Sequence, residues 1–173
     1  MITLVTGGTK CGKSSYAERV LDRFEGQKYY IATMNPVGDD AEEIIARHVE
    51  MRCGKNYVTV ERLRDIGDTE IPEGSGVLLE CVGNLCANEM FVGSEVLDPA
   101  KKIVEGIKRL SEKTKELVIV TNEVGSDGND YSPDTMAYIK QMAIINRRIA
   151  ELADNVVECV YGIPIVRKGS LIC

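Results

Sequence analysis

A glycine-rich octapeptide near the start of the chain constrains its fold more than any other feature. Residues Gly7 to Ser14 read G-G-T-K-C-G-K-S, which matches the P-loop pattern G-x-x-x-x-G-K-[ST], and they follow the β-branched, apolar run Ile2 to Thr6. Glycines let backbone N–H groups approach phosphate oxygens, Lys13 can reach the β and γ phosphates, and the Ser14 hydroxyl can ligate Mg²⁺. A helix after the loop would point its positive end at the same anion. The sequence therefore predicts a nucleoside triphosphate site in a strand–loop–helix unit.

Short apolar runs alternate with helical patterns along the rest of the chain. This rhythm is typical of an α/β domain with a mainly parallel sheet flanked by helices, and we expect residues 1–173 to form a single domain. Gly162 and Pro164 mark a turn between the last two strands, which could form an antiparallel edge hairpin. The expected strands cover residues 3–6, 29–33, 77–82, 117–122, 156–160 and 163–167, and the expected helices cover residues 14–24, 40–52, 99–116 and 133–153.

Net charge and cysteine usage exclude several classes of protein. A net charge of −6 argues against a general nucleic-acid binder, because phosphate backbones demand a surplus of Lys and Arg. No apolar run approaches the length of a membrane span, and no secretory signal is visible at the N-terminus. The six cysteines include no C-x-x-C pair, so their spacing fits neither a zinc site nor a disulfide framework. A reduced cytoplasm is therefore the expected location.

Acidic residues follow two of the later apolar runs. The run 77–79 ends in Glu80, where a P-loop protein usually places an acid that holds Mg²⁺ or its water. The run 117–120 is followed by Thr-Asn-Glu-Val-Gly, in which Glu123 could orient a hydroxyl or act as a base. Ligands of α/β proteins bind where parallel strands end, which favours a role in the site. The alternative is that both glutamates are only solvated residues at strand ends.

The only histidine, His48, lies between Arg47 and Arg52 in a helical pattern. Nearby cations favour neutral imidazole and attract phosphate, so His48 could act as a nucleophile toward phosphorus. The spacing also fits an ordinary histidine beside an apolar helix face, with the two arginines paired to Glu43 and Glu50.

Six stretches of sequence carry a family resemblance across nearly the whole chain. T-N-E-V-G after a strand and A-R-H in the second helix are more specific than the P-loop alone. On these stretches the chain resembles the bifunctional adenosylcobinamide kinase/adenosylcobinamide-phosphate guanylyltransferase family of cobalamin biosynthesis. The stretches are L-V-T-G-G at 4–8 leading into the P-loop, Y-I-A-T at 30–33, I-A-R-H at 45–48, L-L-E-C at 78–81, V-T-N-E-V-G at 120–125, and N-R-R-I-A at 146–150 with A-D at 153–154.

The resemblance implies a RecA-like P-loop fold, a homotrimer and two reactions. First, a nucleoside triphosphate phosphorylates the aminopropanol hydroxyl of adenosylcobinamide. GTP then guanylylates an enzyme histidine, and the GMP passes to adenosylcobinamide phosphate to give adenosylcobinamide-GDP. By its place in the A-R-H motif, His48 is the residue that would carry GMP.

The resemblance also implies a set of site residues. Mg²⁺ would be the cofactor, held by Ser14 and Glu80, and GTP or ATP the co-substrate. Lys13 and His48 would be catalytic, and Glu123 is our candidate base for the kinase step. The expected nucleotide contacts are Gly7, Gly8, Thr9, Lys10, Cys11, Gly12, Lys13 and Ser14, then Ala32, Thr33 and Met34, then Val49, Glu50, Met51 and Arg52, and finally Glu61 and Glu80.

The chain departs from the family pattern in two places. Where family members often carry Arg-Pro and then Trp, residues 52–57 read R-C-G-K-N-Y, so an aromatic contact there would fall to Tyr57. A Phe-Arg-Asp segment before the last helix is replaced by Tyr138, Ile139 and Lys140. Two other functions stay open on the sequence: a P-loop kinase of another small hydroxyl substrate, and a GTP-binding regulatory protein without turnover.

Overall fold

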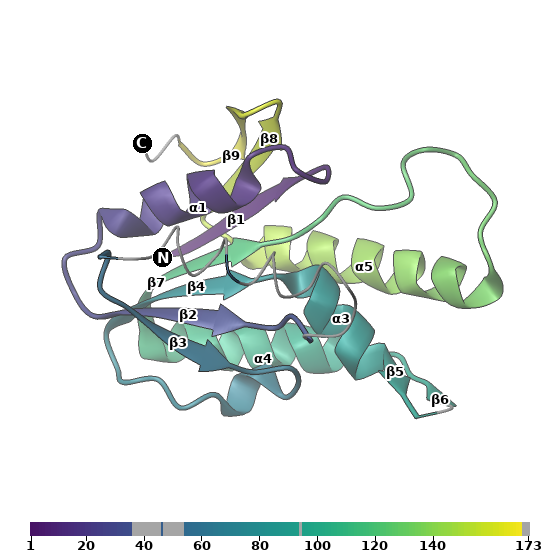
Figure 1. Ribbon diagram of the computed structural model, residues 1–173, viewed down its shortest axis with the longest axis horizontal. Helices are drawn as coiled ribbons and strands as arrows, with labels where there is room; N and C mark the ends of the chain where they lie inside the picture. Colours follow the sequence, from purple (N-terminus) through teal and green to yellow (C-terminus); the bar gives the residue numbers. More distant parts are fainter. Residues whose placement is uncertain (36–45, 47–53, 94, 171–173) are drawn as a thin grey trace.

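The computed structural model describes residues 1–35, 46, 54–93 and 95–170, and its centre is a seven-stranded sheet (Figure 1). The strand order is β3-β2-β4-β7-β1-β8-β9, and each neighbouring pair is parallel except β8 with β9. The strands of this sheet are β1 (Ile2–Gly7), β2 (Lys28–Ala32), β3 (Tyr57–Glu61), β4 (Ser75–Glu80), β7 (Thr114–Val120), β8 (Asn155–Val160) and β9 (Ile163–Lys168). The expected parallel α/β sheet and its antiparallel edge hairpin are thus confirmed.

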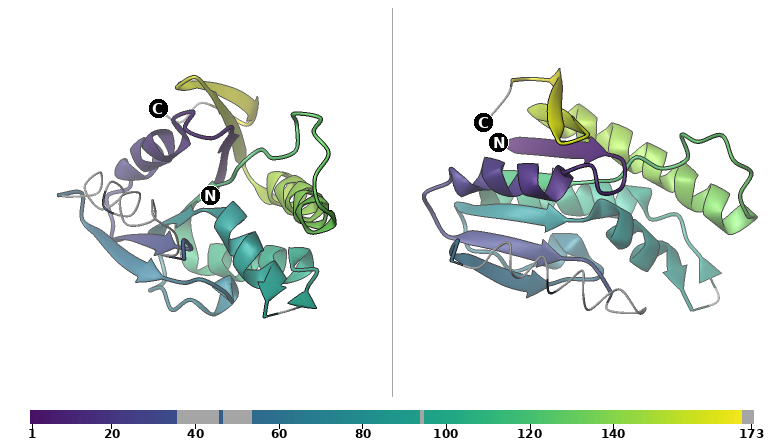
Figure 2. Two further views of the ribbon diagram at one scale, coloured as in Figure 1. Left: turned by 45° about the vertical axis from the view of Figure 1, so that its right-hand side comes forward. Right: turned by 45° about the horizontal axis from the view of Figure 1, so that its top comes forward.

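Helices cover both faces of this sheet (Figure 2). Helix α1 (Lys13–Asp22) packs on one face, where Tyr16 and Leu21 join strand residues such as Val5 and Val118 in a buried cluster. The opposite face is covered by α3 (Val82–Met90), α4 (Ala100–Lys113) and α5 (Pro133–Leu152), with a 3₁₀ turn η1 (Ile66–Asp68) against α4. A short hairpin, β5 (Phe91–Val92) and β6 (Glu95–Val96), extends beyond α3.

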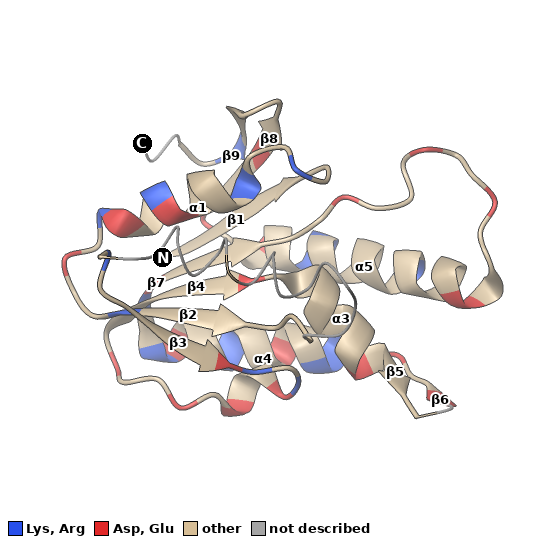
Figure 3. Ribbon diagram, viewed as in Figure 1, with Lys and Arg blue, Asp and Glu red and all other residues tan. Residues whose placement is uncertain are grey.

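Charged residues lie mostly on helices and connecting segments, whereas the central strands carry few of them (Figure 3). All six residues of β4 are buried, which is expected of a central strand covered on both faces. Among the described residues, no helix has both the length and the apolar character needed to cross a bilayer.

Several expected element boundaries are wrong, and the strand predicted over 117–122 is Thr114–Val120. The strand predicted over 77–82 ends at Glu80, and α3 begins at Val82 because Val82, Leu85 and Cys86 recur at helical spacing and bury one face in the core. The helix predicted over 99–116 ends at Lys113, because the next residues pair with β4 as the start of β7. Strand β3 and the hairpin β5–β6 were not predicted.

Candidate nucleotide site

The P-loop begins where β1 ends, and two of its glycines occupy positions that strongly disfavour a larger residue. Gly12 has φ 96°, in the left-handed region that favours glycine, and α1 starts at the next residue. Gly7 has φ 141°, and a Cβ there would lie 2.5 Å from the carbonyl oxygen of Cys159. On the far side of the loop, the Gly162 N–H donates to the Cys11 carbonyl at 2.9 Å, so the β8–β9 turn supports the loop.

Lys13, the first residue of α1, is only 7% exposed. Its ammonium donates to the Gly8 carbonyl at 2.5 Å and lies 3.9 Å from the Cys11 sulfur. The charged end of this lysine therefore folds back onto the loop that precedes its own helix. Backbone N–H groups at the start of a helix and a lysine held beside them form an arrangement suited to an anion.

The next residue, Ser14, contacts the end of β4. Its hydroxyl donates to Glu80 Oε1, while the Tyr30 hydroxyl donates to Glu80 Oε2 at 3.3 Å. Glu80 is the last residue of β4 and is only 8% exposed. A hydroxyl beside a carboxylate presents the oxygen ligands that Mg²⁺ prefers, so these residues fit the predicted metal. Within the described part of the chain, no three His, Cys, Asp or Glu side chains form a metal-binding group, so phosphates and water would supply the other ligands.

Strand β7 lies between β1 and β4, and Glu123 follows it at the same end of the sheet, where these parallel strands finish. The Thr121 N–H donates to the Val5 carbonyl at 2.9 Å and the Glu123 N–H donates to the Gly7 carbonyl at 3.1 Å. These bonds extend the strand pairing past the end of β7 to the beginning of the P-loop. The Glu123 side chain is exposed, so its carboxylate is free to meet a substrate from solvent.

Thr33 links the ends of β2 and β4. It is fully buried, and its hydroxyl both donates to the Cys81 carbonyl and accepts from the Cys81 N–H, each at 2.8 Å. Its own N–H donates to the Glu80 carbonyl at 3.1 Å. The Thr33 hydroxyl is therefore used within the protein, and the two strand ends are held in fixed register.

The other expected contacts lie in the P-loop, at the ends of β2 and β3, or outside the described residues. Gly8, Thr9 and Lys10 are exposed in the loop, and Ala32 lies in register with both Glu80 and Glu61. Glu61 is exposed at the end of β3, next to β2, and Met34 is half-buried. His48 and the residues from Val49 to Arg52 lie outside the described residues.

Tyr57 lies at the end of the sheet where the parallel strands begin, opposite the end that carries the P-loop. It begins β3, pairs in register with Lys28, and its ring centroid is 5.2 Å from the Lys28 ammonium. Its hydroxyl donates to Asp22 at 3.5 Å. This position does not favour the nucleotide contact expected of Tyr57.

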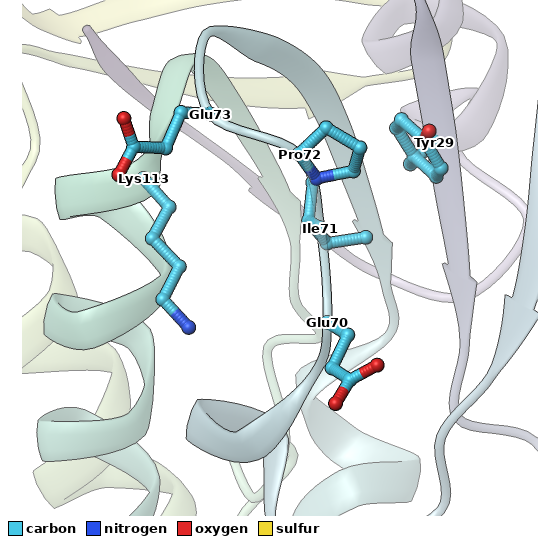
Figure 4. Close-up of a pocket in the computed structure, with 6 residues that line it drawn as sticks. All are labelled: Tyr29, Glu70, Ile71, Pro72, Glu73 and Lys113. Carbon is cyan, nitrogen blue, oxygen red and sulfur yellow. The ribbon is translucent and has the colours of Figure 1, made fainter.

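A pocket also lies at the end of the sheet where the parallel strands begin (Figure 4). Tyr29, near the start of β2, lines it on one side, and Lys113, the last residue of α4, on another. Residues 70–73, which precede β4, complete the lining. The pocket is therefore separate from the strand ends that carry the P-loop and Glu80.

Two polar groups at the site were missed in the sequence. Tyr30 was noted only within a family stretch, because its contact with Glu80 depends on β2 and β4 being neighbours. Asn146 of α5 accepts from the Thr121 hydroxyl at 2.6 Å and donates to the Asn122 carbonyl at 3.1 Å. The available signal was an asparagine among the apolar positions of α5, within the family stretch at 146–150.

The contact between α3 and α5 borders this site. Tyr138 of α5 donates to the Gly83 carbonyl at 3.3 Å, and burial raises the pKa of its hydroxyl to about 12. Burial likewise raises the pKa of the Cys86 thiol to about 12, and it raises the pKa of Cys81. These groups stay neutral near pH 7 and pack rather than react.

Comparison with known protein families shows which family shares this sequence. A family model described as cobinamide kinase / cobinamide phosphate guanyltransferase, CobU, matches residues 3–166. The chain belongs to this family. The CobU match includes the P-loop, Glu80 and Glu123, so the chain belongs to a family of nucleotide-using transferases.

Curated relatives agree with the CobU assignment. The bifunctional adenosylcobalamin biosynthesis protein CobU of Escherichia coli (strain K12) is 29% identical over 183 residues, which covers 97% of this chain and 100% of the relative. The corresponding protein CobP of Pseudomonas aeruginosa is 25% identical and covers 98% of each chain. Among solved structures, an ATPase from a bacterial type III secretion system gives a TM-score of 0.55 at 8% identity. That likeness covers 96% of this chain but only 56% of the ATPase, and it shows a shared fold.

Proposed function

We propose that this protein phosphorylates the aminopropanol hydroxyl of adenosylcobinamide and then transfers GMP from GTP to the resulting phosphate. Membership of the CobU family and the names of the relatives support this pair of reactions. The structural observation that carries the proposal is the buried Lys13 followed by the Ser14–Glu80 contact where β1 and β4 end. Such a site binds a nucleoside triphosphate and leaves its γ phosphate accessible to a second substrate.

In the kinase step, the substrate hydroxyl oxygen attacks the γ phosphorus of the triphosphate. A new oxygen–phosphorus bond forms, the bond from the γ phosphorus to the β–γ bridging oxygen breaks, and nucleoside diphosphate leaves. Glu123 takes the hydroxyl proton, and Lys13 stabilises charge on the transferring group. Ser14 and Glu80 would hold Mg²⁺, which supplies further charge neutralisation when bound.

In the guanylyltransferase step, an imidazole nitrogen of His48 attacks the α phosphorus of GTP. The nitrogen–phosphorus bond forms as the α–β bridging bond breaks, and pyrophosphate leaves. A phosphate oxygen of adenosylcobinamide phosphate then attacks the same phosphorus, and the imidazole is released. A covalent intermediate divides one difficult displacement into two easier ones.

The two steps are tested separately with labelled nucleotide. Protein incubated with α-labelled GTP should retain an acid-labile, alkali-stable label, and added adenosylcobinamide phosphate should remove it. His48→Ala should abolish this label while γ-phosphate transfer from labelled GTP to adenosylcobinamide continues. A wild-type protein that phosphorylates adenosylcobinamide but never takes up α label would contradict the guanylyltransferase half. Absence of γ transfer from both GTP and ATP would contradict the kinase half.

A further inference from the structure

Tyr30 is a buried tyrosine whose hydroxyl meets the acid at the end of β4. The residue lies on β2 and is only 5% exposed, in the same buried cluster as Leu78 and Val120. Its hydroxyl donates to Glu80 Oε2 at 3.3 Å, while Ser14 donates to Oε1. The Glu80 carboxylate is thus contacted from two different elements, by Ser14 of α1 and by Tyr30 of β2.

The backbone at Glu80 is fixed independently of Tyr30. Ala32 and Glu80 are in register across β2 and β4, and the Thr33 N–H donates to the Glu80 carbonyl. A glutamate side chain on a fixed backbone still rotates about its own bonds. The Tyr30 contact to Oε2 adds to the Ser14 contact to Oε1, and together they restrain the plane of the carboxylate.

We propose that Tyr30 is a positioning residue, which holds the Glu80 carboxylate in the orientation that presents Oε1 beside Ser14. This inference rests on the proposed function, in which Ser14 and Glu80 hold the Mg²⁺ that accompanies the triphosphate. Tyr30 touches neither nucleotide nor metal in this scheme. It lowers the cost of ordering a metal ligand, so its effect is confined to metal-dependent binding.

The test is equilibrium binding of the fluorescent analogue mant-GTP to the whole protein, with Mg²⁺ and with EDTA. Tyr30→Phe removes one oxygen from a buried ring and keeps its shape. We expect the variant to need about 3- to 10-fold more Mg²⁺ for half of the metal-dependent gain in affinity, the effect of losing one hydrogen bond of ordinary strength, because this bond is long at 3.3 Å. Affinity in EDTA should be unchanged, because the P-loop is intact.

Tyr29→Phe is the matched control. Tyr29 is the preceding residue of the same strand, and it packs against the opposite buried cluster and lines the pocket of Figure 4. This variant should show wild-type Mg²⁺ dependence. An equal shift in Tyr29→Phe, or a loss of affinity in EDTA in Tyr30→Phe, would show a general effect on folding and overturn the proposal.

A double-variant cycle with Glu80→Gln tests the route of the effect. If Tyr30 acts only through the carboxylate, adding Tyr30→Phe to Glu80→Gln should cause no further change in Mg²⁺ dependence. Additive shifts would contradict the inference. Failure of the proposed function is distinguishable, because wild-type protein would then bind mant-GTP without transferring phosphate or GMP to the cobinamide substrates.

Discussion

At the scale of single residues, Glu123 offers the clearest separation of the two proposed reactions. Its backbone is fixed beside the P-loop and its carboxylate is exposed to solvent. Glu123→Gln should slow phosphorylation of adenosylcobinamide by about 100-fold, because a positioned base typically contributes that much, and should leave labelling by α-labelled GTP intact. Steady-state rates and label yield measure the two effects. Glu112→Gln, at the exposed end of α4, is the control, and an equal loss of both reactions in Glu123→Gln would contradict the assignment.

The convergence of Lys13, Ser14 and Glu80 could be predicted because each belongs to a local pattern at the end of an apolar run. Parallel strands then bring those ends to one edge of the sheet. Tyr30 could not be assigned in this way. Its contact crosses 50 residues of sequence, and it depends on β4 inserting next to β2, which no local pattern in the sequence reports.

At the scale of elements, the contact of α3 with α5 makes stability sensitive to alkaline pH. The pKa of Tyr138 is raised from 10.0 to about 12, so between these values the folded protein retains a proton that the unfolded chain loses. The free energy of unfolding should therefore fall as pH rises through this window. Tyr138→Phe should make that fall less steep in urea titrations. Tyr161→Phe, which alters a side chain that is 93% exposed, should leave the slope unchanged, and a wild-type slope in Tyr138→Phe would refute this assignment.

The packing of α4 on η1 predicts an unusual effect of alanine in a helix. A Cβ at Gly106 would lie 2.6 Å from Ile66 Cγ2 and 3.0 Å from the backbone nitrogen of Gly67. Gly106→Ala should destabilise the protein by about 1–3 kcal/mol, although alanine alone favours a helix by about 1 kcal/mol. Urea unfolding measures the difference. Lys108→Ala, at an exposed position of α4, is the control and should change the free energy of unfolding by less than about 0.5 kcal/mol. A Gly106→Ala variant more stable than the wild type would contradict the prediction, because η1 would then have moved to accommodate the methyl group.

Elements with strong internal patterns were predictable, and short ones were not. The P-loop unit, the core of β7 and the long helix α5 each carry enough periodicity to identify them. Helix α3 has only nine residues and follows an apolar strand directly, so its first residue was interpreted as more strand. Strand β3 is short and mostly exposed, with a charged residue at its end, which gives little apolar signal.

At the scale of the whole molecule, the parallel sheet determines where chemistry can occur. Strands β1, β7 and β4 are adjacent and parallel, so the P-loop, Glu123 and Glu80 lie together where these strands end. The pocket of Figure 4 lies at the other end of the sheet, where the strands begin. The net charge of −6 makes local cations such as Lys13 the main attraction for a triphosphate. That residues 1–173 form one domain and assemble as a homotrimer stays a prediction.

In the proposed guanylyltransferase step, the P-loop site delivers the α phosphorus of GTP to His48. The most direct measurement is peptide mapping by mass spectrometry, at neutral pH, after incubation with GTP and Mg²⁺. Trypsin cleaves after Arg47 and Arg52, so the fragment His48 to Arg52 isolates the histidine. We expect a GMP adduct on that fragment, and we expect it to be lost when adenosylcobinamide phosphate is added. A GMP adduct on any other fragment, or an active enzyme with no adduct, would contradict the proposed step.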